Sequence, residues 1–221
     1  MKHALIIGAS GGVGSAIAER LRLGGVAVTG LSRRGNGLDV TDETSVSAAL
    51  GALEPGFDLI LVATGALVID GAQPEKTLRK VTAQAMADQF ALNCIGPSLV
   101  LKHSLRLMPR KGRCVFAALS ARVGSIGDNH LGGWYSYRTA KAALNQMIHS
   151  AAIELGRTHP EAVCVALHPG TVATEFTRNY AATHDTVPPA QAASNLLGVI
   201  EGLTPAQTGL FFDWQGKQVV W

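Results

Sequence analysis

Short runs of consecutive apolar residues recur along the whole chain. Each run has about the length of a β-strand, and apolar residues at successive positions are typical of strands that are buried on both faces. We therefore expect one strand at each run. The runs are Ala4–Ile7, Val26–Val28, Leu59–Val62, Cys114–Phe116, Val163–Leu167 and Leu210–Phe212.

Segments with helical spacing lie between these runs. Apolar residues recur every three or four positions over Val13–Leu23, Leu92–Leu105 and Ala142–Ile148. This alternation of strands and helices predicts an α/β fold, a doubly wound parallel sheet with right-handed crossovers and helices on both faces. We expect a single domain over residues 1–221, with ligands bound beyond the carboxyl ends of the strands.

The composition excludes several classes of protein. Of 221 residues, 47% are hydrophobic and 16% are charged, which is enough apolar material for one core and too little charge for a disordered chain. The net charge of +3 is far from the dense basic patch that nucleic acid binding needs. The apolar runs are much shorter than the roughly 20 residues of a membrane span. We therefore expect a cytoplasmic protein with no nucleic acid or membrane partner.

The cysteines and histidines show no disulfide or metal-binding pattern. Cys94, Cys114 and Cys164 form no Cys-x-x-Cys pair and are odd in number, which favours a reducing compartment. The seven histidines show no His-x-x-x-His spacing and no cysteine partner, so no metal site is expected. His168 either lines the ligand cleft or is a hydrogen-bonded histidine at the end of a strand.

A glycine-rich turn follows the first predicted strand and opens the first helix. Backbone N–H groups in such a turn can approach a pyrophosphate, and the helix N-terminus adds partial positive charge. The alternative is a tight turn that needs glycine only for positive φ, and the spacing differs from the common Gly-x-Gly-x-x-Gly. The nucleotide site predicted here consists of Gly8, Ser10, Gly11, Gly12, Val13 and Gly14.

The residues after the second strand indicate which dinucleotide is bound. A site specific for NAD is expected to carry an acidic residue there, whereas this chain has Arg33 and Arg34. Their guanidinium groups favour a 2′-phosphate, so NADP(H) is expected unless both arginines are merely solvated. Asp39, followed by Val40, could contact the adenine amino group, and Thr41 is expected to cap the next helix.

A tyrosine and a lysine share one face of a later helix. Tyr137 and Lys141 are four residues apart near the start of a helix that runs toward Leu155, so the ammonium can lie near the phenol. Moving a tyrosine pKa from about 10 to near neutrality takes roughly 4 kcal/mol. One positive charge at about 4 Å in an effective dielectric near 20 supplies on the order of that amount. The pair is a candidate acid, although the same spacing is common on helix surfaces.

Five motifs follow one another along the chain: Gly8-x-x-x-Gly12-x-Gly14, Asp39, Asn93, Tyr137-x-x-x-Lys141 and Pro169-Gly170-Thr171-Val172-x-Thr174. In order and approximate spacing they resemble the motifs of the short-chain dehydrogenase/reductase superfamily, over essentially the whole chain. The segments Ser120–Ile126, Gly132–Arg138 and Phe211–Gly216 look like its C-factor and Sniffer-like carbonyl reductase branch. The resemblance implies a Rossmann fold.

The resemblance also implies hydride transfer between nicotinamide and a carbonyl carbon, with the protein supplying positioning and a proton. Tyr137 would be the acid in reduction and the base in oxidation. Lys141 would lower the tyrosine pKa and bind the nicotinamide ribose, and Asn93 would hold a water in a proton relay. The other residues implied at the cofactor are Pro169, Gly170, Val172 and Thr174, together with Ala63, Thr64 and Gly65 in place of the family's usual Asn-Ala-Gly.

The family's serine, which hydrogen-bonds the substrate oxygen, is out of register in this chain. It commonly lies three residues before a glycine, and counting back from Gly124 reaches Ala121. We select Ser120 because it directly follows the strand when the strand is extended over Cys114–Leu119, with Ser125 as the rival. Both serines could instead only cap or turn the loop.

The sequence predicts an NADP(H)-dependent reductase of a ketone, an aldehyde or a similar carbonyl. The alternative is a catalytically idle, dinucleotide-binding signalling or sensor protein of the C-factor type. Trp134 and Tyr135 could form an apolar wall for substrate or simply pack. The family implies a homodimer or homotetramer in which the helix after Tyr137 packs on a twin subunit. The irregular stretch Thr177–Pro189 is expected to be a mobile loop where the substrate lid is shortened.

Overall fold

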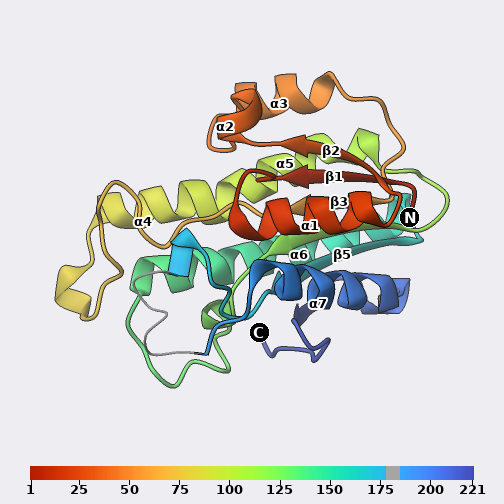
Figure 1. The fold of residues 1–221 in the computed structure, drawn as a ribbon. Helices are drawn as coiled ribbons and strands as arrows, with labels where there is room; N and C mark the ends of the chain where they lie inside the picture. The colour runs from red at the N-terminus through yellow and green to blue at the C-terminus, as the bar shows by residue number, and fades with distance from the viewer. Residues whose placement is uncertain (178–184) are drawn as a thin grey trace.

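The computed structural model describes residues 1–177 and 185–221, which form one six-stranded sheet. All neighbouring strands are parallel, in the order β2-β1-β3-β4-β5-β6, so the order reverses between β1 and β3 (Figure 1). The expected doubly wound α/β fold is confirmed, and each strand overlaps the apolar run that predicted it. The strands are β1 His3–Ile7, β2 Ala27–Leu31, β3 Leu59–Val62, β4 Cys114–Leu119, β5 Ala162–His168 and β6 Phe211–Asp213.

Helices cover both faces of the sheet, as Figure 1 shows. One face packs against α1 (Gly12–Leu23) and α7 (Pro189–Gly202). The other face packs against α3 (Glu43–Gly51), α5 (Gly96–Ser104) and α6 (Tyr135–Thr158). The remaining helical segments are α2 Arg33–Asn36, α4 Ala83–Phe90 and single turns at Leu78–Lys80, Leu105–Leu107, Arg122–Gly124, Glu175–Thr177 and Pro205–Gln207.

The turns that follow β1 and β3 lie directly against one another. The Ala63 N–H donates to the Ile7 carbonyl at 2.8 Å, and the Gly8 N–H donates to the Leu31 carbonyl at 2.8 Å. Gly8 has a φ of +87°, and a Cβ there would lie 2.8 Å from the Ala63 carbonyl oxygen. Only glycine allows this close approach, which places both turns at the point where the strand order reverses.

The helix expected over Leu92–Leu105 begins earlier and contains a wider turn. α4 continues through a π-helical turn, Ala91–Ile95, directly into α5, and the Gly96 N–H bonds to the carbonyl of the first residue of that turn. Pro97 has no N–H to return to the carbonyl of Asn93, so a regular helical hydrogen bond is missing at this point. The apolar pattern did not predict this turn, because it follows the ordinary period of 3.6 residues.

The helix after Asp39 begins one residue later than expected. Asp42 caps α3 by accepting a hydrogen bond from the Thr44 N–H at 2.9 Å. The Thr41 hydroxyl donates instead to Asp39, at 2.7 Å. The prediction that Thr41 caps this helix is therefore wrong. The Asp42 carboxylate both accepts the hydrogen bond and complements the positive end of the helix dipole.

The expected loop over Thr177–Pro189 is described only at its two ends. Residues 178–184 lie outside the described residues, so the prediction for them is untested. Past that gap, Val187 donates to the Thr171 carbonyl at 3.0 Å and accepts from the Ala173 N–H at 2.9 Å. The chain before α7 is thus joined to the segment after β5. Among the described residues, no helix has both the length and the apolar character to cross a membrane.

Candidate active site

A cavity of about 460 Å³ opens beyond the carboxyl ends of β1, β3, β4 and β5. The first turns of α6 form another part of its wall. This is the position at which parallel α/β sheets bind ligands, because the loops after successive strands diverge where the strand order reverses. The expected site residues that line the cavity are Gly11, Gly12, Val13, Ala63, Thr64, Gly65, Ser120, Tyr137, Lys141, Pro169, Gly170, Val172 and Thr174.

Seven of the expected site residues do not line this cavity. The two glycines among them that flank the turn shape its backbone, since a Cβ at Gly14 would collide with the Gly8 carbonyl. Val40 is buried, and a Cβ at Gly96 would lie 2.9 Å from its Cγ2. The seven residues are Gly8, Ser10, Gly14, Arg33, Asp39, Val40 and Asn93.

The glycine turn has the properties of an anion site. Gly11 is the N-cap of α1, and no side chain caps the first N–H groups of that helix. No acidic residue lies in the first turn of α1. A Cβ at Gly12 would lie 2.5 Å from Thr174 Cγ2, so only glycine leaves the N-terminus of α1 open to the cavity. Free N–H groups and the helix dipole at this position fit the diphosphate of a dinucleotide.

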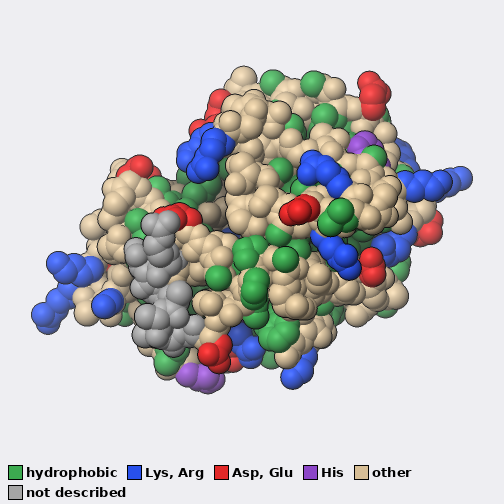
Figure 2. All heavy atoms as spheres, viewed as in Figure 1, with side chains coloured by type: hydrophobic (Ala, Val, Ile, Leu, Met, Phe, Trp, Pro, Cys, Tyr) green, Lys and Arg blue, Asp and Glu red, His purple; other side chains and the backbone are tan. Residues whose placement is uncertain are grey.

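Two arginines lie where β2 passes into α2. Ser32 caps α2 by accepting from the Gly35 N–H at 3.0 Å, and Arg33 and Arg34 extend into solvent. Figure 2 shows Lys and Arg side chains gathered at this place. Hydrogen bonds from Thr41, and to a smaller degree the charge of Arg33, lower the pKa of Asp39. The exposed guanidinium groups fit a phosphate here better than ribose hydroxyls alone.

Tyr137 and Lys141 lie together in the cavity wall. Their exposed fractions are 6% and 2%, respectively. Lys141 Nζ donates to the Leu119 carbonyl at 2.9 Å and lies 5.8 Å from the centre of the Tyr137 ring. Glu75 accepts hydrogen bonds from both the N–H and the hydroxyl of Ser136, which anchors the first turn of α6. The two side chains are therefore held on a fixed part of the helix.

Burial changes the pKa values of this pair in opposite directions. It raises the pKa of Tyr137 and lowers the pKa of Lys141 to about 8. The lowering of the Tyr137 pKa by Lys141 that the family resemblance implies is not seen in the described residues and stays a prediction. The ammonium donates to the Leu119 carbonyl, and the loss of solvent is what raises the tyrosine pKa. A phenol with a raised pKa keeps its proton at neutral pH, which is the state that an acid requires.

Asn93 lies behind the cavity wall. Its Nδ2 donates to Gln89 at 2.6 Å and to the Ala66 carbonyl at 2.9 Å, and within the described residues its buried Oδ1 has no hydrogen-bond partner. A Cβ at Gly65 would lie 2.7 Å from that oxygen and 3.5 Å from Lys141 Nζ. Gly65 therefore separates an open acceptor from an ammonium. The relay water implied by the family resemblance stays a prediction.

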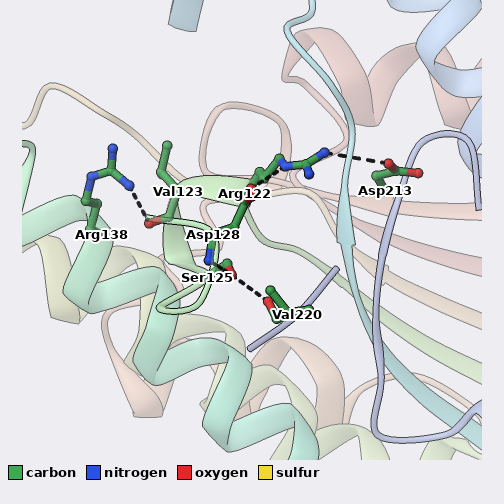
Figure 3. Close-up of polar contacts among 7 residues, drawn as sticks. All are labelled: Arg122, Val123, Ser125, Asp128, Arg138, Asp213 and Val220. Atoms are coloured by element: carbon green, nitrogen blue, oxygen red, sulfur yellow. Dashed lines mark hydrogen bonds and ion pairs between the residues drawn. The ribbon is translucent and has the colours of Figure 1, made fainter. Parts of the chain in front are cut away.

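The structure separates the two candidate serines, of which Figure 3 draws Ser125. Ser125 does not line the cavity, and its hydroxyl donates to the Val220 carbonyl at 2.5 Å and accepts from the Asp128 N–H at 3.1 Å. Ser120 lines the cavity, and its hydroxyl donates to Asn145 Oδ1 on α6 at 2.6 Å. Of the two serines, Ser120 is therefore the one that lines the cavity, although its hydroxyl hydrogen is already donated to Asn145.

The loop after β4 also brings a charged side chain that the sequence analysis did not consider. Arg122 lines the cavity, and its Nε lies 2.5 Å from Asp128 Oδ2 (Figure 3). Its Nη1 lies 3.9 Å from Asp213 Oδ2. The two carboxylates come from the same loop and from the end of β6. No spacing in the sequence indicates this meeting, because Arg122 and Asp213 are distant in the chain.

Aromatic rings flank the candidate acid. Trp134 and Phe176 line the cavity, with ring centres 6.4 Å and 6.2 Å from that of Tyr137. Tyr135 is not part of the lining, so only one of the two residues expected to form an apolar wall does so. Phe176 was missed because it lies in an irregular segment with no periodic pattern. The rings give this part of the cavity an apolar surface that suits an organic substrate.

Three comparisons bear on what this chain is related to. A family model described as Enoyl-(Acyl carrier protein) reductase matches residues 8–201. 1-Hydroxy-2-glutathionyl-2-methyl-3-butene dehydrogenase of Rhodococcus sp. (strain AD45) is 31% identical over 240 residues, covering 100% of each chain. C-signal of Myxococcus xanthus is 37% identical over 137 residues, 62% of this chain and 78% of that protein. Among solved structures, NADPH-bound carbonyl reductase from chicken fatty liver superposes with a TM-score of 0.84 at 22% identity. The match covers 100% of this chain and 94% of that chain.

Proposed function

Because the chain belongs to the short-chain dehydrogenase/reductase family, we propose that it is an NADP(H)-dependent oxidoreductase that interconverts a carbonyl compound and its alcohol. The observation that carries the proposal is one cavity whose wall contains the glycine turn, Tyr137 and Lys141. The bound dinucleotide would supply hydride chemistry at the carbonyl carbon. The chain's own residues would bind both partners and provide the proton.

The cavity and its rim offer separate groups for each part of the cofactor. The uncapped N-terminus of α1 would bind the diphosphate, and Arg33 would bind the 2′-phosphate. Val172 and Thr174 would hold the carboxamide, and Lys141 the nicotinamide ribose. The NADPH-bound reductase from chicken liver has the same fold and supports this choice of cofactor by analogy.

Tyr137 would donate its hydroxyl proton to the carbonyl oxygen as negative charge develops there. Its raised pKa keeps that proton in place until the oxygen becomes the stronger base. The buried ammonium of Lys141 would stabilise the phenolate that remains. Gly65 leaves room between Lys141 and the open Asn93 Oδ1, where a water would return a proton to the tyrosine.

Dehydrogenase activity is favoured over an idle dinucleotide sensor. The Rhodococcus relative, which matches over the full length of both chains, is a dehydrogenase by name. The likeness to C-signal agrees with the expected resemblance to the C-factor branch. Trp134 and Phe176 beside Tyr137 favour a carbonyl substrate with an apolar body.

We retain the expectation of a homo-oligomer as a proposal. Large apolar side chains are exposed on the outer side of two neighbouring helical segments, with Met147 and Ile153 on α6 and Ile95 and Leu105 beside α5. Such side chains would be covered by packing against a second copy of the chain. This proposal concerns assembly alone and does not alter the chemistry at the cavity.

The first test of the function measures cofactor choice and turnover together. NADPH and NADH are titrated against the protein, and absorbance of the reduced nicotinamide is then followed with a panel of aldehydes and ketones. We expect NADPH to bind at least about tenfold more tightly, because a guanidinium–phosphate pair contributes roughly 1.4 kcal/mol or more. Arg33→Asp should remove this preference, whereas Arg157→Asp at the exposed end of α6 should keep it. Tighter binding of NADH would contradict the role of Arg33, and a panel without any turnover would contradict the reductase.

A further inference from the structure

His168 is the last residue of β5, and it lines the cavity. Its Nδ1 is buried, and no group in the described residues reaches it with a hydrogen bond. Of the two interpretations that the sequence left open, a fully hydrogen-bonded histidine is therefore excluded. A buried polar atom without a partner costs free energy, so its presence at a cavity wall requires an explanation.

Sheet register places His168 beside Ser120. Leu119 pairs with Leu167, and the Ser120 N–H continues this ladder by donating to the Leu167 carbonyl at 2.8 Å. Side chains alternate between faces along a strand, so His168 lies on the same face as Cys164, whose Sγ donates to a carbonyl of α6. The imidazole thus lies on the side of the sheet that also carries Tyr137.

Two of the other donors in the cavity wall are already engaged. The Ser120 hydroxyl donates to Asn145, and Lys141 Nζ donates to the Leu119 carbonyl. Arg122 Nε is paired with a carboxylate, and position 121 carries only a methyl group. A carbonyl oxygen bound here would gain negative charge during reduction and would need a second donor besides the tyrosine.

The His168 ring has the protonation state that such a donor needs. Burial and, to a smaller extent, the charge of Arg122 lower the pKa of His168 to about 4, so the ring is neutral at physiological pH. A neutral imidazole carries one N–H and one acceptor nitrogen. With Nδ1 closed off from solvent, Nε2 is the nitrogen on the ring edge left for the cavity, and a 180° turn of the ring exchanges the two edges.

We propose that His168 donates a hydrogen bond to the substrate oxygen alongside Tyr137, and so takes the place of a hydroxyl that Ala121 does not provide. In the forward direction a hydride supplied by the dinucleotide would add to the carbonyl carbon as the π electrons move onto the oxygen. The oxygen would take its proton from Tyr137, which is left as a phenolate. The imidazole N–H stabilises this oxygen without giving up its proton. The proposal rests on the proposed function and specifies how that same site holds its substrate.

The test compares variants with the carbonyl compound of the panel that the wild type reduces fastest. We expect His168→Leu to lower kcat/KM on the order of 10²-fold while leaving NADPH affinity unchanged, since one donor to a developing oxyanion has about this effect. His168→Asn, whose amide keeps an N–H, should lose less than His168→Leu. Ala121→Ser, added to His168→Leu, should recover at least about tenfold by offering a new hydroxyl. His103→Leu, at the surface pair with Glu43, is the control and should match the wild type.

A second readout does not depend on turnover. In protein with ¹⁵N-labelled histidine and bound NADP⁺, the carboxamide analogue of the chosen carbonyl should shift the ring nitrogen signals of His168, identified by their loss in His168→Asn. Unshifted signals, or kcat/KM of both His168 variants within about threefold of wild type, would overturn the proposal. If Tyr137→Phe is inactive in the same assay, only this inference has failed. If Tyr137→Phe is fully active, the proposed function has failed with it.

Discussion

At the scale of single residues, the site depends on two titratable groups that are almost fully out of water. Burial raises the pKa of Tyr137, so in the proposed reaction the phenol would keep its proton until the substrate oxygen can accept it. Lys141 is destabilised by it, because an ammonium is held away from solvent with one carbonyl as its recorded hydrogen-bond acceptor. The lysine is therefore placed at a cost to folding, as is common for groups that serve a function.

This cost leads to a prediction for Lys141→Met. The pKa of Lys141 falls from 10.5 to about 8 on folding, so at pH 7 the buried charge costs about 3 kcal/mol. The substitution also removes the hydrogen bond from Lys141 to the Leu119 carbonyl, which lowers the free energy of unfolding by about 1 kcal/mol. We expect the variant to be more stable than the wild type at pH 7 by about 2 kcal/mol, as measured by urea unfolding, and to be inactive.

The lowered pKa of Lys141 also predicts how the stability of the wild type changes with pH. Between the folded pKa of about 8 and the unfolded value of 10.5, the unfolded chain binds more protons, so wild-type stability rises with pH across this window. The advantage of Lys141→Met should therefore shrink as the pH is raised from 8 to 10.5. A variant that is less stable than the wild type at pH 7 would show that the ammonium is not destabilising.

Individual site residues were predictable where local spacing decides their position. Tyr137 and Lys141 are one helical turn apart, so any helix over this segment brings them together. The choice between Ser120 and Ser125 depends on Asn145 and Val220, which contact these serines only in the folded chain. The rise of the Tyr137 pKa on burial was not predicted, because a spacing argument includes the nearby charge and omits the loss of solvent.

At the scale of elements, the sequence predicted all six strands, because strands buried on both faces are nearly continuous apolar runs. It did not predict the π turn at Ala91–Ile95, since Pro97, four residues past the centre of the turn, leaves no periodic pattern of its own in the sequence. The sequence also assigned the N-cap of α3 to Thr41. Thr41 and Asp42 are adjacent and both can cap a helix, but in the structure Thr41 bonds to Asp39 and Asp42 accepts from the Thr44 N–H. The errors are concentrated at the ends and irregular points of elements, where propensities differ least.

The contact between α1 and the turn after β1 gives a prediction for Gly14→Ala. A Cβ at this position would overlap the Gly8 carbonyl, which is backbone and cannot rotate away. α1 would have to move from the turn, so we expect the free energy of unfolding to fall by about 2 to 3 kcal/mol. Thermal unfolding of the variant provides the measurement.

Gly156→Ala is the matched control for that change. Gly156 is an exposed residue of α6, and nothing lies within 4 Å of a Cβ added there. There the same substitution should raise stability by about 0.5 to 1 kcal/mol, because alanine is the better helix former. Equal effects at the two positions would contradict the close contact between α1 and the Gly8 turn.

At the scale of the whole molecule, four strand ends, the start of α1 and the start of α6 converge on one cavity. Its general position follows from the strand order and could be predicted before any side chain was placed. Its chemistry could be predicted only in part, because Arg122 and Phe176 reach it from segments without a periodic pattern. The cavity brings the glycine turn, Lys141 and Tyr137 together, which makes the tyrosine the central residue of the proposed function.

The most direct measurement is Tyr137→Phe, which removes one oxygen from the cavity wall and leaves the ring. NADPH affinity and the steady-state reduction rate are measured on the same protein samples. We expect NADPH binding to stay within about twofold of wild type while kcat falls by about 10²- to 10⁴-fold, the usual contribution of a positioned acid. A variant that binds NADPH and still reduces carbonyl compounds at the wild-type rate would contradict the account.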